Sequence, residues 1–290
     1  MTTLYWYRYV VKLYIINLIS FFVFIILIIK DKLFRNEDND MRILVYHSIM
    51  KVPKNKDTLR ITVPPKLFQM QLAYLLSSGY SIVSMDNLLD YMSNDKPVSN
   101  KKIVLTFDDG FDDNFDYSYN ILKKNGLTAT YFLTCNYIGS NRVFPWYDEN
   151  SPYGKPITWE EVSRMASDGM GIGSHTLTHI NLGRISHDTG KLYEEIKTSK
   201  EMLEDKLKMP VRYFSYPFGC KGSYNAITED IIKKSGYKAA CVDIFGVNKK
   251  NDNIFELKRT RIDWNDTLFR FRMKIEGAYD WVDRLRSKSR

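Results

Sequence analysis

Cysteine and histidine are both scarce in this chain, whose 290 residues include three cysteines and four histidines. The cysteines, Cys135, Cys220 and Cys241, are odd in number and lack the spacing of a zinc knuckle. A disulfide scaffold and a cysteine-based metal site are therefore not expected, and we expect free or buried thiols. Low-complexity tracts and internal repeats are absent as well, which argues against a solenoid or a fibrous protein.

Acidic residues are fewer than basic residues, which gives a formal net charge of +8 at pH 7. The basic residues are scattered, without an arginine-rich or aromatic-interleaved tract, so we expect no nucleic acid as a partner. A basic surface of this size suits an anionic cell envelope or a phospholipid surface. The hydrophobic fraction of 44% is ordinary for a folded globular chain.

A long apolar run without charge occurs near the N-terminus, where residues 13–29 read LYIINLISFFVFIILII. Asn17 and Ser20 are its clearly polar members. With Val10 and Val11 the run approaches the length that crosses a bilayer as a helix. No small-residue cleavage site follows it, which favours a retained anchor over a cleaved signal peptide. A buried core helix is the remaining alternative.

We therefore expect a membrane anchor over residues 1–30, with residues 10–29 in the bilayer. A polar linker follows over residues 31–41, and one folded domain occupies residues 42–290. Basic residues before the apolar run favour an N-terminus inside the cell. The expected location is the cell membrane, crossed once, with the folded domain on the extracellular side.

Strand and helix signals alternate about seven times along the folded domain. Short apolar runs, such as residues 42–47 and 103–107, predict strands, and the stretches between them have helical spacing. This alternation predicts an α/β fold with a parallel sheet, either a barrel or a doubly wound sheet. Active sites in such folds gather at the C-terminal ends of the strands.

The first candidate motif is TFDDG over residues 106–110, at the end of a predicted strand. Adjacent carboxylates repel each other, so Asp108 and Asp109 share one site at low cost only if a cation or separate roles resolve the conflict. An Asp-Asp-Gly triplet is also a common turn. The spacing of the acidic residues does not fit an EF-hand.

The second candidate motif is GSHTLTH over residues 173–179. His175 and His179, four positions apart, lie on one helix face or in one turn after a strand, and such pairs bind transition metals. The alternative is a pair of surface or capping histidines. One Asp and two His form a three-ligand set for a divalent metal, which polarises a carbonyl and activates water. With the second Asp as general base, the two motifs predict hydrolysis of an amide or ester.

The third candidate motif is FSYPFG over residues 214–219, also at the end of a predicted strand. A backbone N–H just after Pro217 is placed to bind a developing oxyanion. By itself this motif is more often a simple turn.

These three motifs, in this order, resemble the polysaccharide deacetylase family, also called carbohydrate esterase family 4 or the NodB-homology group. The resemblance runs from about residue 42 to residue 271 and implies a distorted (β/α)7-type barrel. It implies a divalent metal, zinc first with cobalt or nickel as alternatives, and a backbone N–H of Phe218 in the oxyanion site. The residue roles that it implies are Asp108 as catalytic base and Asp109, His175 and His179 as metal ligands.

Two departures from the family pattern favour one branch. Ser215 stands where most members carry an arginine, and no histidine follows His187, so the family's late Leu-x-His motif is absent. Poly-N-acetylglucosamine deacetylases share both departures and take their acid histidine from a Tyr-His pair near the start of the domain. Tyr46-His47 matches that pair, so the resemblance implies His47 as general acid, with a packed strand-end histidine as the alternative.

The late segment Thr260-Arg261-Ile262 resembles the closing segment of the same branch. It implies that Arg261 orients catalytic groups or binds substrate. Trp264 is expected to line the sugar groove, or else to be an ordinary packed tryptophan. Pro217 and Phe218 complete the residues expected to contact substrate.

The expected function is metal-dependent removal of N-acetyl groups from an extracellular N-acetylhexosamine polysaccharide, a biofilm-type poly-N-acetylglucosamine or a related exopolysaccharide. One alternative is an N-deacetylase of peptidoglycan or chitooligosaccharides. Another is a catalytically silent sugar-binding protein of an envelope polysaccharide assembly. The expected partners are the N-acetylated polysaccharide, the membrane and the exopolysaccharide synthesis machinery.

Overall fold

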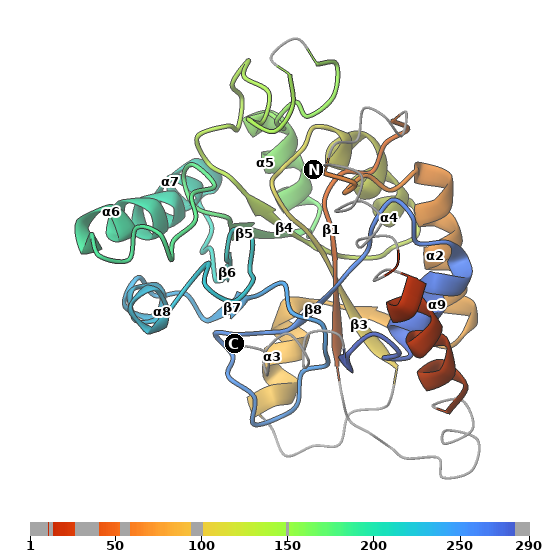
Figure 1. The fold of residues 1–290 in the computed structure, drawn as a ribbon. Coiled ribbons are helices and arrows are strands. Elements are labelled where there is room, and N and C mark those ends of the chain that lie inside the picture. Colours follow the sequence, from red (N-terminus) through yellow and green to blue (C-terminus); the bar gives the residue numbers. More distant parts are fainter. Residues whose placement is uncertain are drawn as a thin grey trace, which may run out of the picture.

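One parallel sheet, curled into a nearly closed barrel, organises the domain (Figure 1). The structure is a computed structural model that describes residues 11, 14–26, 41–52, 59–93, 101–148 and 151–281. Its strands follow the order β7-β6-β5-β4-β3-β1-β8, and β2 pairs with β3. The strands are β1 (Arg42–Tyr46), β2 (Ser81–Val83), β3 (Lys102–Phe107), β4 (Thr130–Leu133), β5 (Gly171–Ser174), β6 (Tyr213–Ser215), β7 (Ala239–Cys241) and β8 (Arg259–Arg261).

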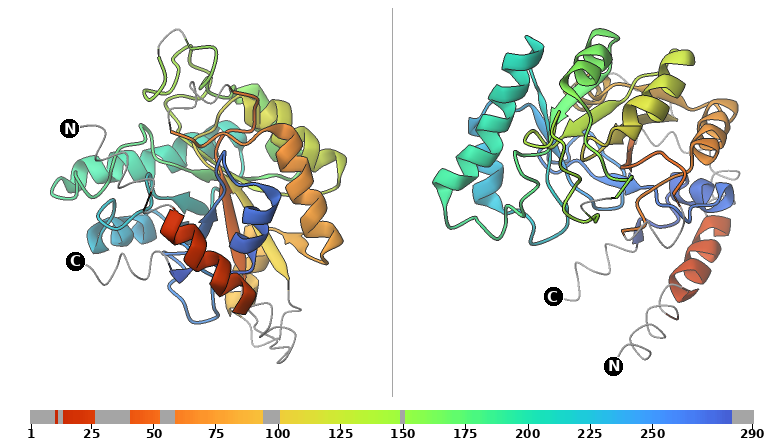
Figure 2. Two further views of the ribbon diagram at one scale, coloured as in Figure 1. Left: turned by 45° about the vertical axis from the view of Figure 1, so that its right-hand side comes forward. Right: turned by 90° about the horizontal axis from the view of Figure 1, so that it is seen from above.

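Helices cover the outside of this barrel, as the alternating pattern predicted (Figure 2). The helices expected over residues 115–124 and 186–207 are present, but each contains a π-helical turn. A parallel bridge between Cys241 and Leu257 links β7 to the segment before β8, which nearly closes the barrel. The helical elements are α2 (Pro65–Ser77), α3 (Met85–Ser93), η1 (Asn114–Tyr119), α4 (Asn120–Lys124), α5 (Trp159–Ser167), α6 (Thr189–Tyr193), η2 (Glu194–Thr198), α7 (Ser199–Leu207), α8 (Ala226–Lys234) and α9 (Leu268–Ile275).

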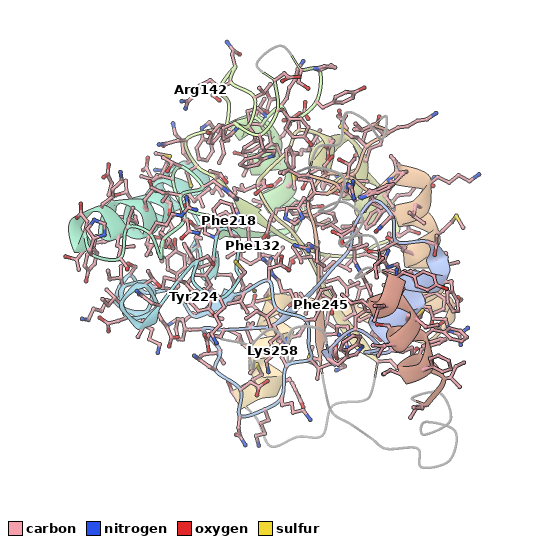
Figure 3. All side chains as sticks on the ribbon, in the orientation of Figure 1. Phe132, Arg142, Phe218, Tyr224, Phe245 and Lys258 are labelled. Carbon is pink, nitrogen blue, oxygen red and sulfur yellow. The ribbon has the colours of Figure 1, made fainter. Side chains whose placement is uncertain are left out.

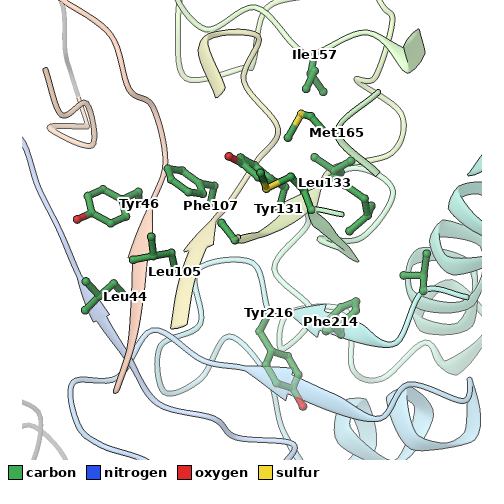
Figure 4. Packing of buried hydrophobic residues seen from close by; sticks show 14 of the residues in the cluster. Leu44, Tyr46, Leu105, Phe107, Tyr131, Leu133, Ile157, Met165, Phe214 and Tyr216 are labelled. Carbon is green, nitrogen blue, oxygen red and sulfur yellow. The ribbon is translucent and has the colours of Figure 1, made fainter. Parts of the chain in front are cut away.

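The alternation of side chains along the strands divides the core into two layers. Leu44 and Tyr46 on β1 point to the outer helices, whereas Ile43 belongs to the cluster that faces the barrel interior and packs with α3. Aromatic rings stack along the outer layer, with ring centroids 5.4 Å apart for Tyr46 and Phe107 and 4.8 Å apart for Phe107 and Tyr131 (Figure 4). The interior positions of the strands turn polar near their C-terminal ends, where the site lies.

A helix over residues 14–26 packs on the outside of α9, and the two lie side by side in Figures 1 and 2. Among the helices that the structure describes, none combines the length and the hydropathy needed to cross a membrane. Residues 10, 12, 13 and 27–29 of the predicted crossing lie outside the described residues, and the crossing stays a prediction. Apart from Met41, the polar linker expected over residues 31–41 lies outside the described residues.

Candidate active site

The loops after β3, β5 and β6 carry the three motifs, at the C-terminal ends of those strands. Seven non-glycine residues in the described chain have a positive φ angle, and four of them are in these loops: Asp109 at 74°, Thr176 at 67°, His179 at 62° and Phe218 at 65°. A non-glycine residue in this region costs about 1–3 kcal/mol and persists only where its surroundings fix it. The concentration of backbone strain in three neighbouring loops marks them as a candidate site.

Asp109, His175 and His179 converge on one point, with both histidines in a turn after β5 rather than on a helix. Asp109 Oδ1 lies 3.4 Å from His175 Nε2 and 3.3 Å from His179 Nε2, and the three ligand atoms lie within 4.8 Å of one another. Ligand atoms about 2.1 Å from a tetrahedral ion are about 3.4 Å apart. Asp109 Oδ1 is buried and has no hydrogen-bond partner among the described residues. These three residues therefore fit a divalent cation.

Neighbouring groups orient each imidazole. His175 Nδ1 lies 2.8 Å from the carbonyl oxygen of Ser215, which can only accept, so Nδ1 donates and Nε2 keeps its lone pair for a metal. The ring of His179 contacts the rings of Trp146 and Phe218, with centroid distances of 4.8 Å and 5.0 Å. The donor atoms of the predicted ligand set are thus held in place before any ion binds.

The backbone between the two histidines is fixed by Glu195, a buried carboxylate on η2. Its Oε2 accepts hydrogen bonds from the N–H groups of Leu177 (3.1 Å) and Thr178 (3.0 Å), and its Oε1 accepts one from the Thr178 hydroxyl (2.6 Å). Hydrogen bonds to a carboxylate are stronger than those between neutral groups. Glu195 therefore fixes the shape of the loop that carries both histidines, a role that no motif had indicated.

Asp108 has different partners from its neighbour Asp109. Its two oxygens accept hydrogen bonds from Arg259 Nη1 and Nη2, each at 2.7 Å, and Oδ2 accepts a third from the Ser215 hydroxyl at 3.0 Å. Burial by itself would raise the pKa of Asp108, but the charge and hydrogen bonds of Arg259, together with the nearby imidazoles of His175 and His47, outweigh burial and hold that pKa below its usual range. Asp108 is therefore an ionised carboxylate, fixed in orientation and turned toward the imidazoles, with Oδ2 at 4.0 Å from His175 Nε2.

Arg259 is the functional residue that the sequence reasoning missed. It is 1% exposed on β8, where its Nη2 also donates to the Ser215 hydroxyl at 2.9 Å. Arg261, which was expected to orient catalytic groups, instead pairs with Asp243 at 2.9 Å and Asp263 at 3.2 Å at the cavity wall. The strand β8 was not predicted, because its three residues, RTR, have no apolar alternation. The guanidinium beside Asp108 thus comes from β8 and not from the third motif, where Ser215 stands.

His47 follows β1 and lines the same cavity as Asp109, His175 and His179. Its segment is held by Asp113, which follows the TFDDG motif, and by Asn114, the first residue of η1. Asp113 accepts hydrogen bonds from the Ser48 hydroxyl (2.6 Å) and the Ile49 N–H (2.7 Å). The Asn114 amide donates to the carbonyl oxygen of His47 at 2.8 Å. The segment from Asp108 to Asn114 therefore supplies the predicted base, a predicted metal ligand and the groups that fix the histidine segment.

A cavity of about 1240 Å³ opens above these residues. Aromatic side chains from several loops line it, among them Trp146, Phe218, Tyr224 and Phe245. Figure 3 labels the last three of these, which lie along the β6–β8 side of the barrel. Phe218 is 53% exposed and lines the cavity, so its ring is open to contact with a bound ligand.

Two of the residues predicted to contact substrate do not line the cavity. Pro217 and Trp264 are not among the described residues that line it. The Trp264 ring lies instead under the guanidinium of Arg60, 5.7 Å from its centroid. Within the described chain no group accepts a hydrogen bond from the Phe218 N–H, which leaves this donor free beside the site.

A parallel barrel with an Asp-His-His ligand set and an ionised carboxylate at its C-terminal end has the parts of a metal-assisted hydrolase. A family model described as polysaccharide deacetylase matches residues 95–240, which is half of the chain. The chain therefore belongs to the polysaccharide deacetylase family, and this part of the prediction is confirmed.

Relatives and solved structures support this membership. YxkH of Bacillus subtilis (strain 168) is 29% identical over 220 residues, which cover 76% of this chain and 70% of YxkH. A poly-beta-1,6-N-acetyl-D-glucosamine N-deacetylase of Staphylococcus aureus (strain MRSA252) is 22% identical over 71% of this chain and 73% of its own. The Streptococcus pyogenes deacetylase PplD in complex with acetate superposes with a TM-score of 0.69 at 26% identity, over 81% of this chain and 97% of PplD. IcaB from Ammonifex degensii, with a TM-score of 0.65 at 19% identity, shares the fold.

Proposed function

We propose that this chain is a metal-dependent N-deacetylase of an N-acetylhexosamine polysaccharide, with poly-N-acetylglucosamine as its first candidate substrate. The observation that carries the proposal is the pairing of two adjacent carboxylates with separate partners. Asp109 faces two imidazoles, whereas Asp108 is held by a guanidinium. Both carboxylates can stay ionised in one small volume because each has its own positive or metal-binding partner.

Asp109, His175 and His179 would hold the cation, with zinc as the first candidate and cobalt or nickel as alternatives. A divalent cation bound there supplies Lewis acidity, which polarises the acetyl carbonyl and lowers the pKa of water. Asp108 takes the proton from the attacking water as a C–O bond forms at the acetyl carbon. Arg259 and Ser215 keep the oxygens of Asp108 in one orientation throughout this step.

Collapse of the tetrahedral intermediate breaks the C–N bond and releases acetate and an amine. His47 donates a proton to the leaving nitrogen, because it lines the cavity and its segment is fixed by Asn114. The free N–H of Phe218 is a donor for the oxyanion that precedes this collapse. The product amine is a glucosamine unit still attached to its polymer.

An extended polymer is supported as substrate by the size and lining of the cavity. Its volume of about 1240 Å³ exceeds the 300–1,000 Å³ or so that is usual for small-molecule sites. The name of the Staphylococcus aureus relative supports poly-N-acetylglucosamine as the substrate. Ser215 in the third motif and His47 after β1 also support it, because both match the pattern of the poly-N-acetylglucosamine deacetylases. The extracellular location of the domain and its contact with a polymer synthesis machinery stay predictions.

The test is acetate release from defined oligosaccharides of equal length: β-1,6-linked N-acetylglucosamine, chitooligosaccharide and peptidoglycan fragments. We expect the β-1,6-linked oligomer to have the highest kcat/KM. Faster release from chitooligosaccharide or peptidoglycan would support the alternative substrates. Sugar binding without acetate release, with zinc, cobalt or nickel supplied, would instead identify a silent binding protein.

A further inference from the structure

The cavity above the predicted metal ligands is also lined by a second group of polar side chains, which the proposed chemistry does not use. Phe218 lines the same cavity, and its ring lies 5.0 Å from the ring of His179. One continuous space therefore joins the predicted metal ligands to this second group. Its members, which we call the acidic wall, are Tyr216 after β6, Tyr224, Glu229 on α8 and Glu256 before β8.

The Tyr216 hydroxyl is a buried polar group without a hydrogen-bond partner among the described residues. Tyr216 is 1% exposed, and Figure 4 shows its hydroxyl pointing away from the other labelled side chains of the hydrophobic cluster. A buried hydroxyl that makes no hydrogen bond lowers stability, so proteins keep few of them. Because Tyr216 lines the cavity, a bound ligand can supply the missing hydrogen bond.

The neighbours of this hydroxyl present further hydrogen-bond acceptors. The Tyr224 ring stacks on the Tyr216 ring, with centroids 4.4 Å apart and an angle of 26° between the planes. The Tyr224 hydroxyl donates its proton to Glu256 Oε1 at 2.8 Å, so its oxygen can only accept from a ligand. Glu256 Oε2 lies 3.5 Å from the Asn253 amide, which is a long contact, and can accept a closer donor.

Glu256 also differs in charge from three other carboxylates of the cavity, because no lysine or arginine of the described chain forms an ion pair with it. Three lysines line the cavity as well, and Lys258, the nearest of them in sequence, pairs instead with Asp252 at 2.9 Å. The negative charge of Glu256 is therefore left for a ligand. The three paired carboxylates are Asp108 with Arg259, Glu229 with Lys233 and Asp243 with Arg261.

The electrostatics at the acidic wall favour a cationic donor over a neutral one. Burial, followed by the charges of Glu229 and Glu256, raises the pKa of Tyr216, so its hydroxyl stays neutral beside two carboxylates. An ammonium group has three N–H donors and no acceptor, and it is attracted by carboxylates and by the faces of tyrosine rings. An acetamido group has one N–H donor and no charge. A glucosamine unit therefore matches the acidic wall better than an N-acetylglucosamine unit does.

We propose that the acidic wall is a second sugar subsite, which binds the ammonium group of a glucosamine unit while another unit of the same polymer lies at the metal ligands. This inference rests on the proposed N-deacetylase function. It implies that a polymer strand with some units already deacetylated binds better than a fully acetylated strand. Deacetylated units are then clustered along the polymer rather than scattered at random.

Calorimetric titration of the full chain tests the subsite without depending on hydrolysis. The probes are two β-1,6-linked tetramers, one of glucosamine and one of N-acetylglucosamine, in an Asp108→Asn background that is expected to prevent turnover. We expect Glu256→Gln to bind the glucosamine tetramer about tenfold more weakly and the N-acetylglucosamine tetramer within about twofold of its parent. Unchanged affinity for the glucosamine tetramer would overturn the proposal. Equal losses for the two tetramers would also overturn it, because they would indicate a subsite for sugar hydroxyls.

Two further variants sharpen the titration. Asp230→Asn is the matched control, because this exposed carboxylate follows Glu229 on α8 and does not line the cavity, and it should bind both tetramers as its parent does. Tyr216→Phe removes only the hydroxyl without a partner, so it should bind the glucosamine tetramer about threefold more weakly with no decrease in Tm. Parental affinity in Tyr216→Phe would contradict the place of this hydroxyl in the subsite.

Acetate release by the wild-type chain separates this inference from the proposed function. Among tetramers that carry one glucosamine unit at each position in turn, one should have a KM about tenfold below that of the fully acetylated tetramer. Glu256→Gln should abolish this advantage. Hydrolysis of the fully acetylated tetramer with no advantage at any position would overturn the subsite alone. Absence of acetate release from every tetramer would contradict the proposed function, and the titration would still decide whether the subsite exists.

Discussion

The two carboxylates at the end of β3 are neighbours in sequence, yet they belong to two differently built halves of the site. The metal half joins Asp109 to two histidines that are four positions apart in one loop. The base half joins Asp108 to Arg259, which is 151 positions away. The comparison teaches that a candidate metal-binding set can be recognised from short sequence motifs. The partners of the predicted base, in contrast, come together only when the barrel closes.

Removal of Asp109 should have the largest effect on activity. Asp109→Ala leaves two histidines without the oxygen that both face, so we expect loss of bound metal and of measurable acetate release. Asp108→Asn should keep the metal and lose about 10²–10⁴-fold in kcat, because proton abstraction is lost while the ligand set stays whole. Metal content by elemental analysis, measured beside kcat, separates the two halves. Equal metal contents in the two variants would show that the division is wrong.

Replacement of the histidine after β1 should have the next largest effect. His47→Ala removes the group that protonates the leaving amine, so kcat should fall about 10²–10⁴-fold. The metal content should stay near that of the wild type, because His47 is not part of the ligand set. His187→Ala is the matched control and should keep full activity. Loss of metal from His47→Ala would move this residue to the metal half.

Changes at Arg259 probe the base half without touching a ligand. Arg259→Gln leaves a buried carboxylate without its counter-charge, which should lower the free energy of unfolding by about 3–5 kcal/mol. We expect kcat to fall by about tenfold to a hundredfold, with KM and metal content little changed. Arg259→Lys should restore part of kcat because it returns the charge. Arg261→Gln is the control, and a larger kcat defect there than in Arg259→Gln would reverse the assignment of the two arginines.

Replacement of Asp113 should have a smaller effect, which is on the pH dependence of stability. Burial raises the pKa of Asp113 to about 7, although hydrogen bonds from Ser48, Ile49 and Asn114 oppose the shift. In the unfolded chain this carboxyl titrates near pH 3.9, so between about pH 4 and 7 the folded state holds a proton that the unfolded state has lost. Stability is therefore greatest below this window and falls as pH rises through it. Asp113→Asn should lack this decline, and parallel curves of Tm against pH for the two proteins would contradict the shift.

Truncation of the exposed aromatic beside the metal half should have the smallest effect. Phe218→Ala keeps the backbone N–H and removes a ring that is available to pack on sugar, so KM for a long oligosaccharide should rise about tenfold or less. The value of kcat should stay within about twofold. Phe269→Ala, also an exposed phenylalanine, is the control on α9. A large kcat defect in Phe218→Ala would mean that the ring orients His179 rather than substrate.

Much of the fold was predictable because the strands of a parallel barrel are short apolar runs. The segments between them have apolar residues at helical spacing. The strand β5, for example, lies where the sequence predicted it, over Gly171–Ser174. The strand β8 escaped prediction because each of its three residues is polar, and Arg259 and Thr260 are buried by strand pairing, not by hydrophobicity. The π-helical turns η1 and η2 also carry no local signal that distinguishes them from α-helix.

The site divides in the same way. Asp109, His175 and His179 could be proposed together because their motifs state both residue type and spacing. The choice between Arg259 and Arg261 could not be made from sequence, since two positions apart on a strand they share one face. The structure shows which arginine lies inside the barrel beside Asp108, because Arg259 is 1% exposed whereas the Arg261 side chain is 41% exposed. The supporting carboxylates Glu195 and Asp113 likewise acquire their roles only when distant loops meet.

The most direct test of the central claim is metal removal and replacement on the wild-type chain, followed by acetate release. A chelator should abolish acetate release, and one equivalent of zinc, cobalt or nickel per chain should restore it, with half-restoration at half an equivalent. Full acetate release by protein shown to contain no metal would contradict the account. So would an ion that binds at one equivalent in Asp109→Ala as tightly as in the wild type.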